Sequence, residues 1–480
     1  MKPIFDLERY ASLARQAAAE GAVLLRNEQH TLPLQAGSRI ALFGRAQFHY
    51  YKSGTGSGGL VNTDHVTGIW EALSGPGGYQ CDAEVRAVYD RWVANHPYEM
   101  GNGWAQEPWF QSEMPLEQEL VQQAARRNDA AVILIGRTAG EDQDNADAPG
   151  SCRLTDEERK MLQLVCSAFP RSIVVLNVGN ILDMSWVEEY RPGAVLYAWQ
   201  GGQEGGLGVL DVLTGAVCPS GHLSDTIARR MSDYPAAENY GDDLRNFYKE
   251  DIYVGYRYFE TFAPEKVLYP FGFGLSYTSF SRSLNFCDLT PKGLAVSAVV
   301  QNTGAVPGRE VLQLYVQAPQ GWLGKPARVL CAFGKTGTLA PGDSCEQKLF
   351  CSWKDLASYD DSGVTGHKSA WVLEGGEYRF YLGGDVRSAE PVFRLTLPET
   401  VVEQLEEAAA PTVPFERLRP GPQGEPCWEP VPLAEKDPER RREQNLQIAA
   451  PATGDRGLKL QDVVEGRAAM PEFLAQLTDA

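Results

Sequence analysis

The sequence predicts a parallel-sheet α/β domain, followed by a β-sandwich of roughly immunoglobulin-like size and an extended carboxy-terminal arm. Up to about Thr226, nearly continuous apolar runs alternate with helical patterns, which is typical of a parallel sheet covered on both faces. From about Phe280, apolar residues recur at every second position between turns that contain Asn, Gly and Pro, as in a sandwich of antiparallel strands. Beyond Leu397 the chain is rich in Pro, Glu and Arg, which favours a linker or an extended arm over a packed core.

The elements of the α/β domain follow from the spacing of apolar residues. A helix is expected from Leu7 to Arg26, because apolar residues recur there at helical spacing, and a turn should follow it. Another helix should begin at Thr155, which forms a capping-box pattern with Glu158. The other elements are expected as strands at residues 39–44, 130–135, 172–178 and 194–199, and as helices at residues 68–73, 116–127, 184–190 and 204–213.

Changes in composition mark the expected domain boundaries. The α/β domain is expected over residues 1–230 and the sandwich over residues 280–398. Residues 231–279 between them are aromatic and irregular, and we interpret them as a packed connector. Arg257, which lies among tyrosines, is expected to hold this connector by stacking or by an ion pair. Residues 399–480 are the expected linker.

Composition also limits the classes of partner. The 480 residues include 63 acidic and 44 basic side chains, and the net charge of -19 disfavours nucleic acid and anionic membranes as partners. A neutral or cationic ligand fits this charge better. No apolar stretch of about 18 residues is present, and the first residues run straight into a charged amphipathic helix. The 9 cysteines include no Cys-x-x-Cys pair and fit reduced core thiols, so a cytoplasmic protein is expected.

The strongest candidate for a functional residue is Glu141, in the loop of residues 136–144. This loop follows the apolar strand at residues 130–135 and precedes a well-signalled helix, so it should lie at a carboxyl end of the sheet, where ligand sites gather. A glutamate there can act as a general acid or base if burial or a neighbouring charge tunes its pKa. Arg137 would lower that pKa and nearby aspartates would raise it, so spacing alone does not decide its protonation state. The alternative is an ordinary solvated acidic loop.

A second candidate is the glycine-rich loop, residues 54–59, which contains Ser57. Its letters match G-x-G-x-x-G, but residues 45–53 separate it from the preceding strand, and no acidic residue ends a following strand at the spacing that a dinucleotide site needs. A loop of small residues that lets the Ser57 hydroxyl approach a polar ligand is the better functional interpretation, with a flexible turn as the alternative. His222 and Cys152 are expected to be structural, and no Ser-His-Asp arrangement is apparent.

Several stretches, which span about residues 10 to 395 together, resemble a known family. These stretches are residues 14–27, 54–58, 136–144, 176–179, 199–204 and 270–277. They are similar to the α/β-sandwich half of glycoside hydrolase family 3, the β-glucosidase type with a fibronectin type III-like domain. The resemblance therefore implies a parallel-sheet α/β sandwich followed by a fibronectin type III-like β-sandwich.

The resemblance also implies a reaction. In that family a retaining double displacement releases terminal β-linked sugars without a metal or organic cofactor. An aspartate nucleophile lies on a (β/α)₈ barrel, and a glutamate acid/base lies on a loop of the α/β sandwich. Glu141 matches this acid/base, and Ser57 resembles the sandwich residue that reaches the sugar. Retaining chemistry needs the two carboxyl groups about 5 to 5.5 Å apart.

The barrel and its nucleophile are not found among these residues. Members usually place the barrel first, but some have inverted order, and residues 453–478 resemble the lead-in to their barrel. We therefore expect the front half of an inverted enzyme, silent alone and completed by a barrel in cis or in trans. Its substrate would be an oligosaccharide or an aryl β-glycoside. The alternatives are a non-catalytic carbohydrate-binding or assembly module that keeps the family fold and, more distantly, a dinucleotide oxidoreductase. The sugar, the linkage and association into a homo-oligomer stay open.

Overall fold

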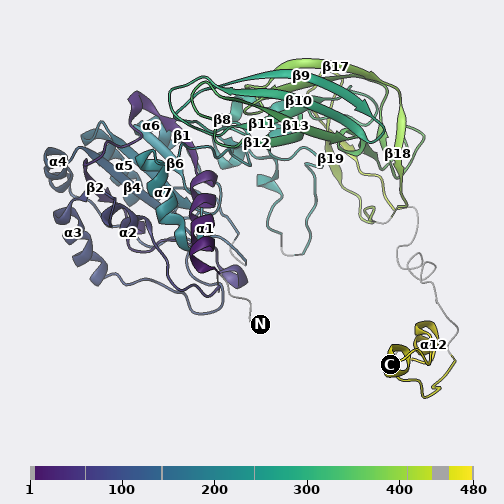
Figure 1. The fold of residues 1–480 in the computed structure, drawn as a ribbon, viewed down its shortest axis with the longest axis horizontal. Coiled ribbons are helices and arrows are strands. Elements are labelled where there is room, and N and C mark those ends of the chain that lie inside the picture. Colours follow the sequence, from purple (N-terminus) through teal and green to yellow (C-terminus); the bar gives the residue numbers. More distant parts are fainter. Residues whose placement is uncertain are drawn as a thin grey trace.

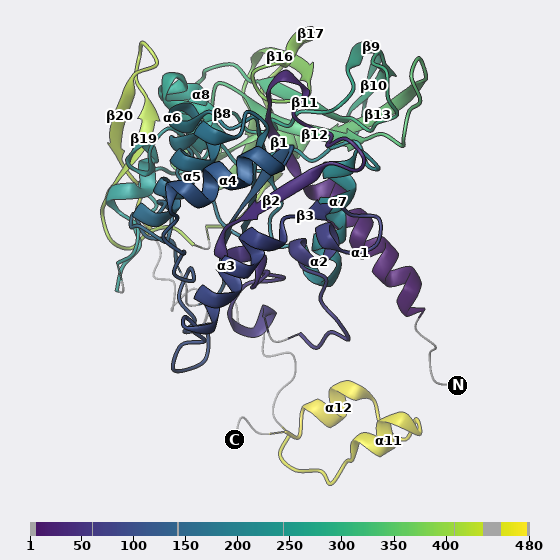
Figure 2. The same ribbon diagram turned by 90° about the vertical axis from the view of Figure 1, so that its left-hand side faces the viewer.

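The computed structural model describes residues 6–59, 61–141, 144–242, 244–407, 409–434 and 453–477. An α/β domain comes first, a β-sandwich packs beside it, and a small helical unit follows near the carboxyl end (Figure 1). In Figure 1 and Figure 2 this unit, which contains α11 (Leu460–Val464) and α12 (Met470–Leu474), lies apart from both larger parts. No helix within the described ranges is long and apolar enough to cross a membrane.

The α/β domain is built on a 6-stranded sheet in the order β1-β6-β5-β4-β2-β3. Strands β2 to β6 pair in parallel, whereas β1 is antiparallel to β6. The prediction of a parallel α/β sheet is therefore confirmed. The strands are β1 Val23–Asn27, β2 Arg39–Phe43, β3 Gln80–Cys81, β4 Ala130–Arg137, β5 Ser172–Val178 and β6 Ala194–Tyr197.

Helices cover both faces of this sheet, because both faces of its central strands are apolar. In β4, Ile133 packs into one buried cluster and its neighbour Val132 into the other. The capping box at Thr155 is formed as predicted. Helix α3 and strand β3 lie where the sequence predicted no element. The helices are α1 Leu7–Gly21, α2 Ile69–Ser74, α3 Ala83–Ala94, α4 Gln118–Arg127, α5 Asp156–Ala168, α6 Trp186–Tyr190 and α7 Gly205–Thr214.

The prediction that the first helix runs to Arg26 is wrong, because α1 ends at Gly21 and the chain continues as β1. Val23, Leu24 and Leu25 are consecutive apolar residues, each at most 3% exposed. In an extended strand, Val23 and Leu25 enter one buried cluster and Leu24 enters the other. A helix would turn one of them toward water, so burial on two faces overrides the helical pattern.

The aromatic connector, residues 231–279, contains α8 (Tyr256–Phe262) and β8 (Val267–Tyr269), and β8 pairs with β7 (Ile227–Ala228), which precedes the connector. It packs on the α/β domain, where the Leu275 amide donates to the carbonyl of Leu24 at 2.8 Å. It also packs on the sandwich, where the ring of Tyr256, which stacks on Phe271 within the connector, meets Tyr315 of the sandwich edge-on. Within the connector, the guanidinium of Arg257 lies over the Tyr256 ring, 6.0 Å from its centroid.

The β-sandwich has one sheet in the order β13-β10-β9 and another in the order β12-β11-β16-β17. Val296 and Leu314, from the two sheets, belong to one buried cluster between them. A short helix and a further sheet, β14-β15-β18, close one end. The elements are β9 Phe280–Thr290, β10 Gly293–Asn302, β11 Val311–Gln317, β12 Val329–Lys335, β13 Ser344–Ser352, α9 Trp353–Leu356, β14 Ser358–Asp360, β15 Ala370–Leu373, β16 Gly376–Gly383, β17 Glu390–Leu397 and β18 Thr400–Gln404.

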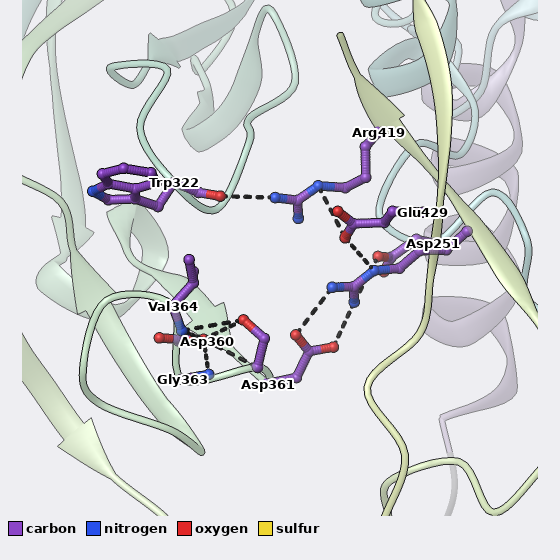
Figure 3. A network of polar contacts seen from close by, with 10 residues as sticks. Asp251, Trp322, Asp360, Asp361, Gly363, Val364, Arg419 and Glu429 are labelled. Atoms are coloured by element: carbon purple, nitrogen blue, oxygen red, sulfur yellow. Dashed lines mark hydrogen bonds and ion pairs between the residues drawn. The ribbon is translucent and has the colours of Figure 1, made fainter. Parts of the chain in front are cut away.

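Strands also occur where the sequence predicts only a linker. Strand β18 pairs with β15, and β19 (Glu416–Pro420) forms a hairpin with β20 (Pro426–Pro430). Arg417 ties this hairpin to the connector at Asp251 and to the sandwich at Asp361, with N···O distances of 3.2 and 2.5 Å. Figure 3 shows Asp251, Asp361 and Glu429 facing one another across this junction. Folded structure therefore continues beyond Leu397.

Candidate active site

Glu141 lies on the loop that follows β4. The strand ends at Arg137, and Glu141 is exposed four residues later at the carboxyl end of the parallel strands. The strand brings the loop there because both of its faces are buried, so it must run through the middle of the domain. This is the placement that the sequence predicted. Asp142, one of the acidic neighbours considered from the sequence, lies outside the described residues.

The glycine-rich loop lies directly against the Glu141 loop. The Thr55 amide donates to the carbonyl of Ala139 at 2.7 Å, and the Thr55 hydroxyl donates to the carbonyl of Glu141 at 3.2 Å. Glycines make this approach feasible, because a Cβ atom on Gly54 would lie 2.0 Å from the Ala139 carbonyl oxygen. Gly56 has φ +77°, and a Cβ atom there would lie 2.5 Å from the Cβ of Glu141. The small residues of this loop are therefore required by the contact between the two loops.

Ser57 donates two hydrogen bonds to the carboxylate of Glu141. Its hydroxyl lies 2.9 Å and its amide nitrogen 3.2 Å from the same oxygen, Oε2. Hydrogen bonds to a carboxylate are charge-assisted, so this pair of donors fixes the orientation of the Glu141 side chain. The structure thus brings together the two residues that the sequence singled out from separate motifs 84 positions apart.

Arg137 does not pair with Glu141, although it lies only four positions away. Its guanidinium turns inward and binds Glu158 through two N···O contacts of 2.7 and 2.6 Å. Both side chains are almost fully buried, with exposed fractions of 3% and 5%. Glu158 also accepts from the Thr155 amide at 2.8 Å in the capping box. Arg137 is therefore the anchor of the strand end and not a partner of the exposed carboxylate.

A cleft of about 340 Å³ opens beside the glycine-rich loop. That volume lies within the range of small-molecule sites. Its other wall is residues 98–107, which include Tyr98 and the half-exposed Trp104. This segment is tied to the Glu141 loop, because the Thr138 amide donates to the Trp109 carbonyl at 2.8 Å and its hydroxyl to Glu107 at 3.2 Å. Sequence reasoning did not assign this wall to the site, since only the tertiary contact with Thr138 reveals it.

The remaining candidates are structural. Residues 56–58 form a short 3₁₀ turn and open no α-helix, which is not the geometry of a dinucleotide fingerprint. His222 has a ring nitrogen 2.5 Å from the carbonyl oxygen of Gly272, and burial lowers its pKa. Cys152 is fully buried, and burial, together with Asp147, raises its pKa to about 11, so its thiol is an inert core group.

Comparison with known proteins agrees with this geometry. Residues 22–277 match the family model described as the glycosyl hydrolase family 3 C-terminal domain. The chain belongs to glycoside hydrolase family 3. Residues 310–386 match the fibronectin type III-like domain model, which identifies the β-sandwich of this family 3 chain. The fold class implied by the resemblance is confirmed.

Relatives of this family 3 chain carry β-glucosidase names. It is 48% identical to a beta-glucosidase of Ruminococcus albus over 475 residues. This match covers 99% of the chain and 50% of that protein. It is 37% identical to beta-glucosidase A of Butyrivibrio fibrisolvens over 540 residues, 98% of the chain and 64% of that protein. The chain thus spans about half to two thirds of the length of these curated relatives.

Solved structures of family 3 enzymes are similar as well. A beta-glucosidase from Paenibacillus barengoltzii superposes with a TM-score of 0.93 at 49% identity, over 99% of this chain and 54% of that one. Beta-glucosidase 3B from Thermotoga neapolitana, in complex with glucose, gives a TM-score of 0.74 at 36% identity, over 82% and 55% of the two chains. The α/β domain and the sandwich therefore have the architecture of β-glucosidases of this family.

Proposed function

We propose that this chain supplies the acid/base half of a retaining β-glucosidase-type hydrolase that acts on terminal β-linked sugars. The observation that carries the proposal is the Glu141 carboxylate, which is exposed at the carboxyl end of β4 and oriented by Ser57 through contacts of 2.9 and 3.2 Å. A general acid must reach the leaving oxygen and be held in a defined orientation, and Glu141 meets both requirements.

The proposed reaction has two steps. In the first, Glu141 donates a proton to the glycosidic oxygen while an aspartate from a barrel attacks the anomeric carbon. In the second, the Glu141 carboxylate takes a proton from water, which attacks the same carbon and releases the sugar with its configuration retained. The Ser57 hydroxyl donates to Glu141, and its lone pairs remain available to accept from a sugar hydroxyl. It can therefore hold both the acid and the substrate.

The nucleophile is proposed to come from a (β/α)₈ barrel outside these 480 residues, in cis or in trans. The 475-residue match covers 50% of the Ruminococcus relative, so that protein is about twice as long, which leaves room in it for such a domain. The wall of the cleft also exposes apolar side chains, with Trp104 50% and Met100 76% accessible. A covering domain that binds the leaving group would bury these side chains.

The cellular location is also proposed to be the cytoplasm. The nine cysteines from Cys81 to Cys427 are all free thiols, which supports a reducing compartment.

One experiment tests the division into halves. The chain alone and the chain mixed with a barrel polypeptide from an inverted-order relative are assayed on an aryl β-glucoside. Turnover is expected only in the mixture or in a fusion of the two, because retaining hydrolysis needs both carboxyl groups. Turnover by the isolated chain would contradict the proposed division.

A second experiment tests the role of Glu141 in the completed enzyme. Glu141→Ala should lower kcat/KM on a glucoside with a poor leaving group by about 10²–10⁴-fold, which is the usual contribution of general acid–base catalysis. On an activated aryl glucoside, azide should restore turnover by attacking the glycosyl intermediate without a general base. Asp144→Ala, in the same loop, is the matched control and should behave like the unmodified enzyme. Failure of azide rescue would remove Glu141 from the acid/base role.

A non-catalytic carbohydrate-binding module is the second candidate, because the cleft beside Tyr98 and Trp104 has the size of a ligand site without any barrel. Glucose titrated into the isolated chain separates the two. Glucose binding that survives Glu141→Ala, together with no turnover by the chain combined with a barrel, would favour the binding module over the enzyme.

A further inference from the structure

Arg45, which directly follows β2 and Gly44, is buried without a polar partner for most of its guanidinium. The residue is 3% exposed, and its Nε and Nη2 atoms have no hydrogen-bond partner in the part of the chain that the structure describes. The guanidinium lies over the ring of Trp92 at 5.2 Å, which compensates a buried charge only partly. Burial lowers the pKa of Arg45 even though the charge of Glu113 acts on it from nearby, and Nε and Nη2 have no hydrogen-bond acceptor among the described residues. A buried cation with unsatisfied donors is unfavourable, so a further group should bind here.

Two more unpartnered polar atoms line the same small cavity as Arg45. They are the Tyr51 hydroxyl, in a residue that is 6% exposed, and Nε2 of His49, an atom that is buried although the residue as a whole has intermediate exposure. The cavity measures about 10 Å³, which is room for one water molecule or one small ion. Arg45, His49 and Tyr51, which lie close together in the sequence, thus line one cavity that is large enough for a single small group.

The unpartnered groups are mainly donors. Arg45 has one N–H on Nε and two on Nη2, and the Tyr51 hydroxyl adds another. Burial, followed by the charge of Arg45, lowers the pKa of His49 to about 4, so its ring is neutral at pH 7 and donates from Nε2 in one tautomer. A water molecule accepts only two hydrogen bonds and needs acceptors for its own two hydrogens. A monatomic anion accepts from every side and also balances the guanidinium charge.

The two carboxylates that line the cavity are already engaged. Glu158 is paired with Arg137. Glu113 accepts from the Arg45 amide at 2.7 Å, from the Met114 amide at 2.8 Å and from the Tyr89 hydroxyl at 3.2 Å. Glu113 therefore acts on the Arg45 guanidinium only through its charge, and neither carboxylate is hydrogen-bonded to Nε or Nη2. We infer that Arg45, His49 and Tyr51 bind one small monovalent anion of the size of chloride in this cavity.

The bound anion would stabilise the start of the glycine-rich loop. The Tyr51 backbone is held at both its amide and its carbonyl by the Asn177 side chain, at 2.8 and 2.9 Å. The Tyr51 ring packs on Gly136, where an added Cβ atom would lie 2.8 Å from it. An anion bound to the Tyr51 hydroxyl therefore braces the residues that lead into both loops of the candidate active site. The inference does not depend on the proposed hydrolase activity.

The first test measures the melting temperature of the whole 480-residue chain in sodium chloride and in sodium gluconate at equal ionic strength. Because an ion that binds only the folded state stabilises it by mass action, the melting temperature should rise with chloride concentration and not with gluconate. Tyr51→Phe removes one donor and should weaken this chloride response. Tyr50→Phe is the matched control, because the Tyr50 hydroxyl already has a partner, the Gly201 amide at 3.0 Å. It should keep the full response.

The second test is direct. Crystals of the chain soaked in sodium bromide should give an anomalous peak within hydrogen-bonding distance of the Arg45 guanidinium and the Tyr51 hydroxyl, and Arg45→Gln should abolish it. Equal melting temperatures in chloride and gluconate, or equal chloride responses of Tyr51→Phe and Tyr50→Phe, would overturn the inference. Density without an anomalous signal would identify water instead and would overturn it as well.

Discussion

The buried pair of Arg137 and Glu158 should be the main stabiliser of the strand end that carries the Glu141 loop. Besides its two bonds to Glu158, Arg137 donates to the carbonyl of Ser151 at 3.1 Å and to that of Gly136 at 2.8 Å. Replacing Arg137 by Met removes all of these bonds. Of the donors to Glu158 named above, only the Thr155 amide then remains, and the Glu158 carboxylate stays buried. Breaking a buried pair on one side costs about 3–5 kcal/mol, so this loss of stability is expected for Arg137→Met.

The assay is urea unfolding followed by circular dichroism. Arg137→Met/Glu158→Met should recover much of the loss, because it leaves no unpaired buried charge. Arg153→Met is the control: Arg153 lies 2.9 Å from Asp147, but their side chains are 43% and 59% exposed, so its loss should be below about 1 kcal/mol. If Arg137→Met is no less stable than Arg153→Met, or if the double variant is no more stable than Arg137→Met, the reasoning fails.

Three further outcomes follow from other contacts. Gly54→Ala should destabilise the chain by about 1–3 kcal/mol and lower turnover of the completed enzyme, because the new Cβ atom would clash with the Ala139 carbonyl. Gly58→Ala is the control, since nothing lies within 4 Å of a Cβ atom there. An equal loss of stability in both variants would contradict this explanation. Burial raises the pKa of Glu113 from 4.5 to about 7, so the folded chain binds that proton more tightly than the unfolded chain. This stabilisation is fully present below about pH 4.5 and is lost as the pH rises through 7, by up to about 3 kcal/mol. Chloride-free urea titrations should show that slope, Glu113→Gln should flatten it, and an unchanged slope would refute the assignment. Arg417→Met should speed amide hydrogen exchange in β19 about tenfold or more, since the hairpin loses its ion pairs, and equal exchange rates would dismiss this role.

The parts of the fold that the sequence predicted are those coded by local pattern. Strand β4 reads as six apolar residues in a row, and Thr155 with Glu158 reads as a capping box; both are formed. Strand β1 was missed because Val23, Leu24 and Leu25 continue the helical pattern of the preceding residues. Only the presence of β6 beside them, where Val23 pairs with Tyr197 and Leu24 with Leu196, decides that they extend.

The hairpin of β19 and β20 was missed for a similar reason. Its residues are polar and rich in proline, which is typical of a linker. It is held by charge, because Arg417, 10% exposed at its side chain, pairs with Asp251 and Asp361 from distant parts of the sequence. Figure 3 shows Arg419 of the same hairpin reaching the Trp322 carbonyl, at 2.9 Å. No local pattern reports that these charges converge, so the sequence alone could not place the hairpin.

The candidate site lies between these cases. Strand β2 pairs in parallel with β4, so the loops that leave their carboxyl ends must emerge side by side at the same edge of the sheet. The glycine-rich loop follows β2 and the Glu141 loop follows β4, and this adjacency is what brings Ser57 to the Glu141 carboxylate. The two motifs therefore form one candidate site, and the close contact between their loops leaves room only for glycine at Gly54 and Gly56. It follows that the orientation of Glu141 is set by residues of the glycine-rich loop as much as by its own loop. Substitutions at Gly54 or Gly56 should thus change the orientation of the Glu141 carboxylate, and with it the proposed acid/base step, without any direct contact with a ligand.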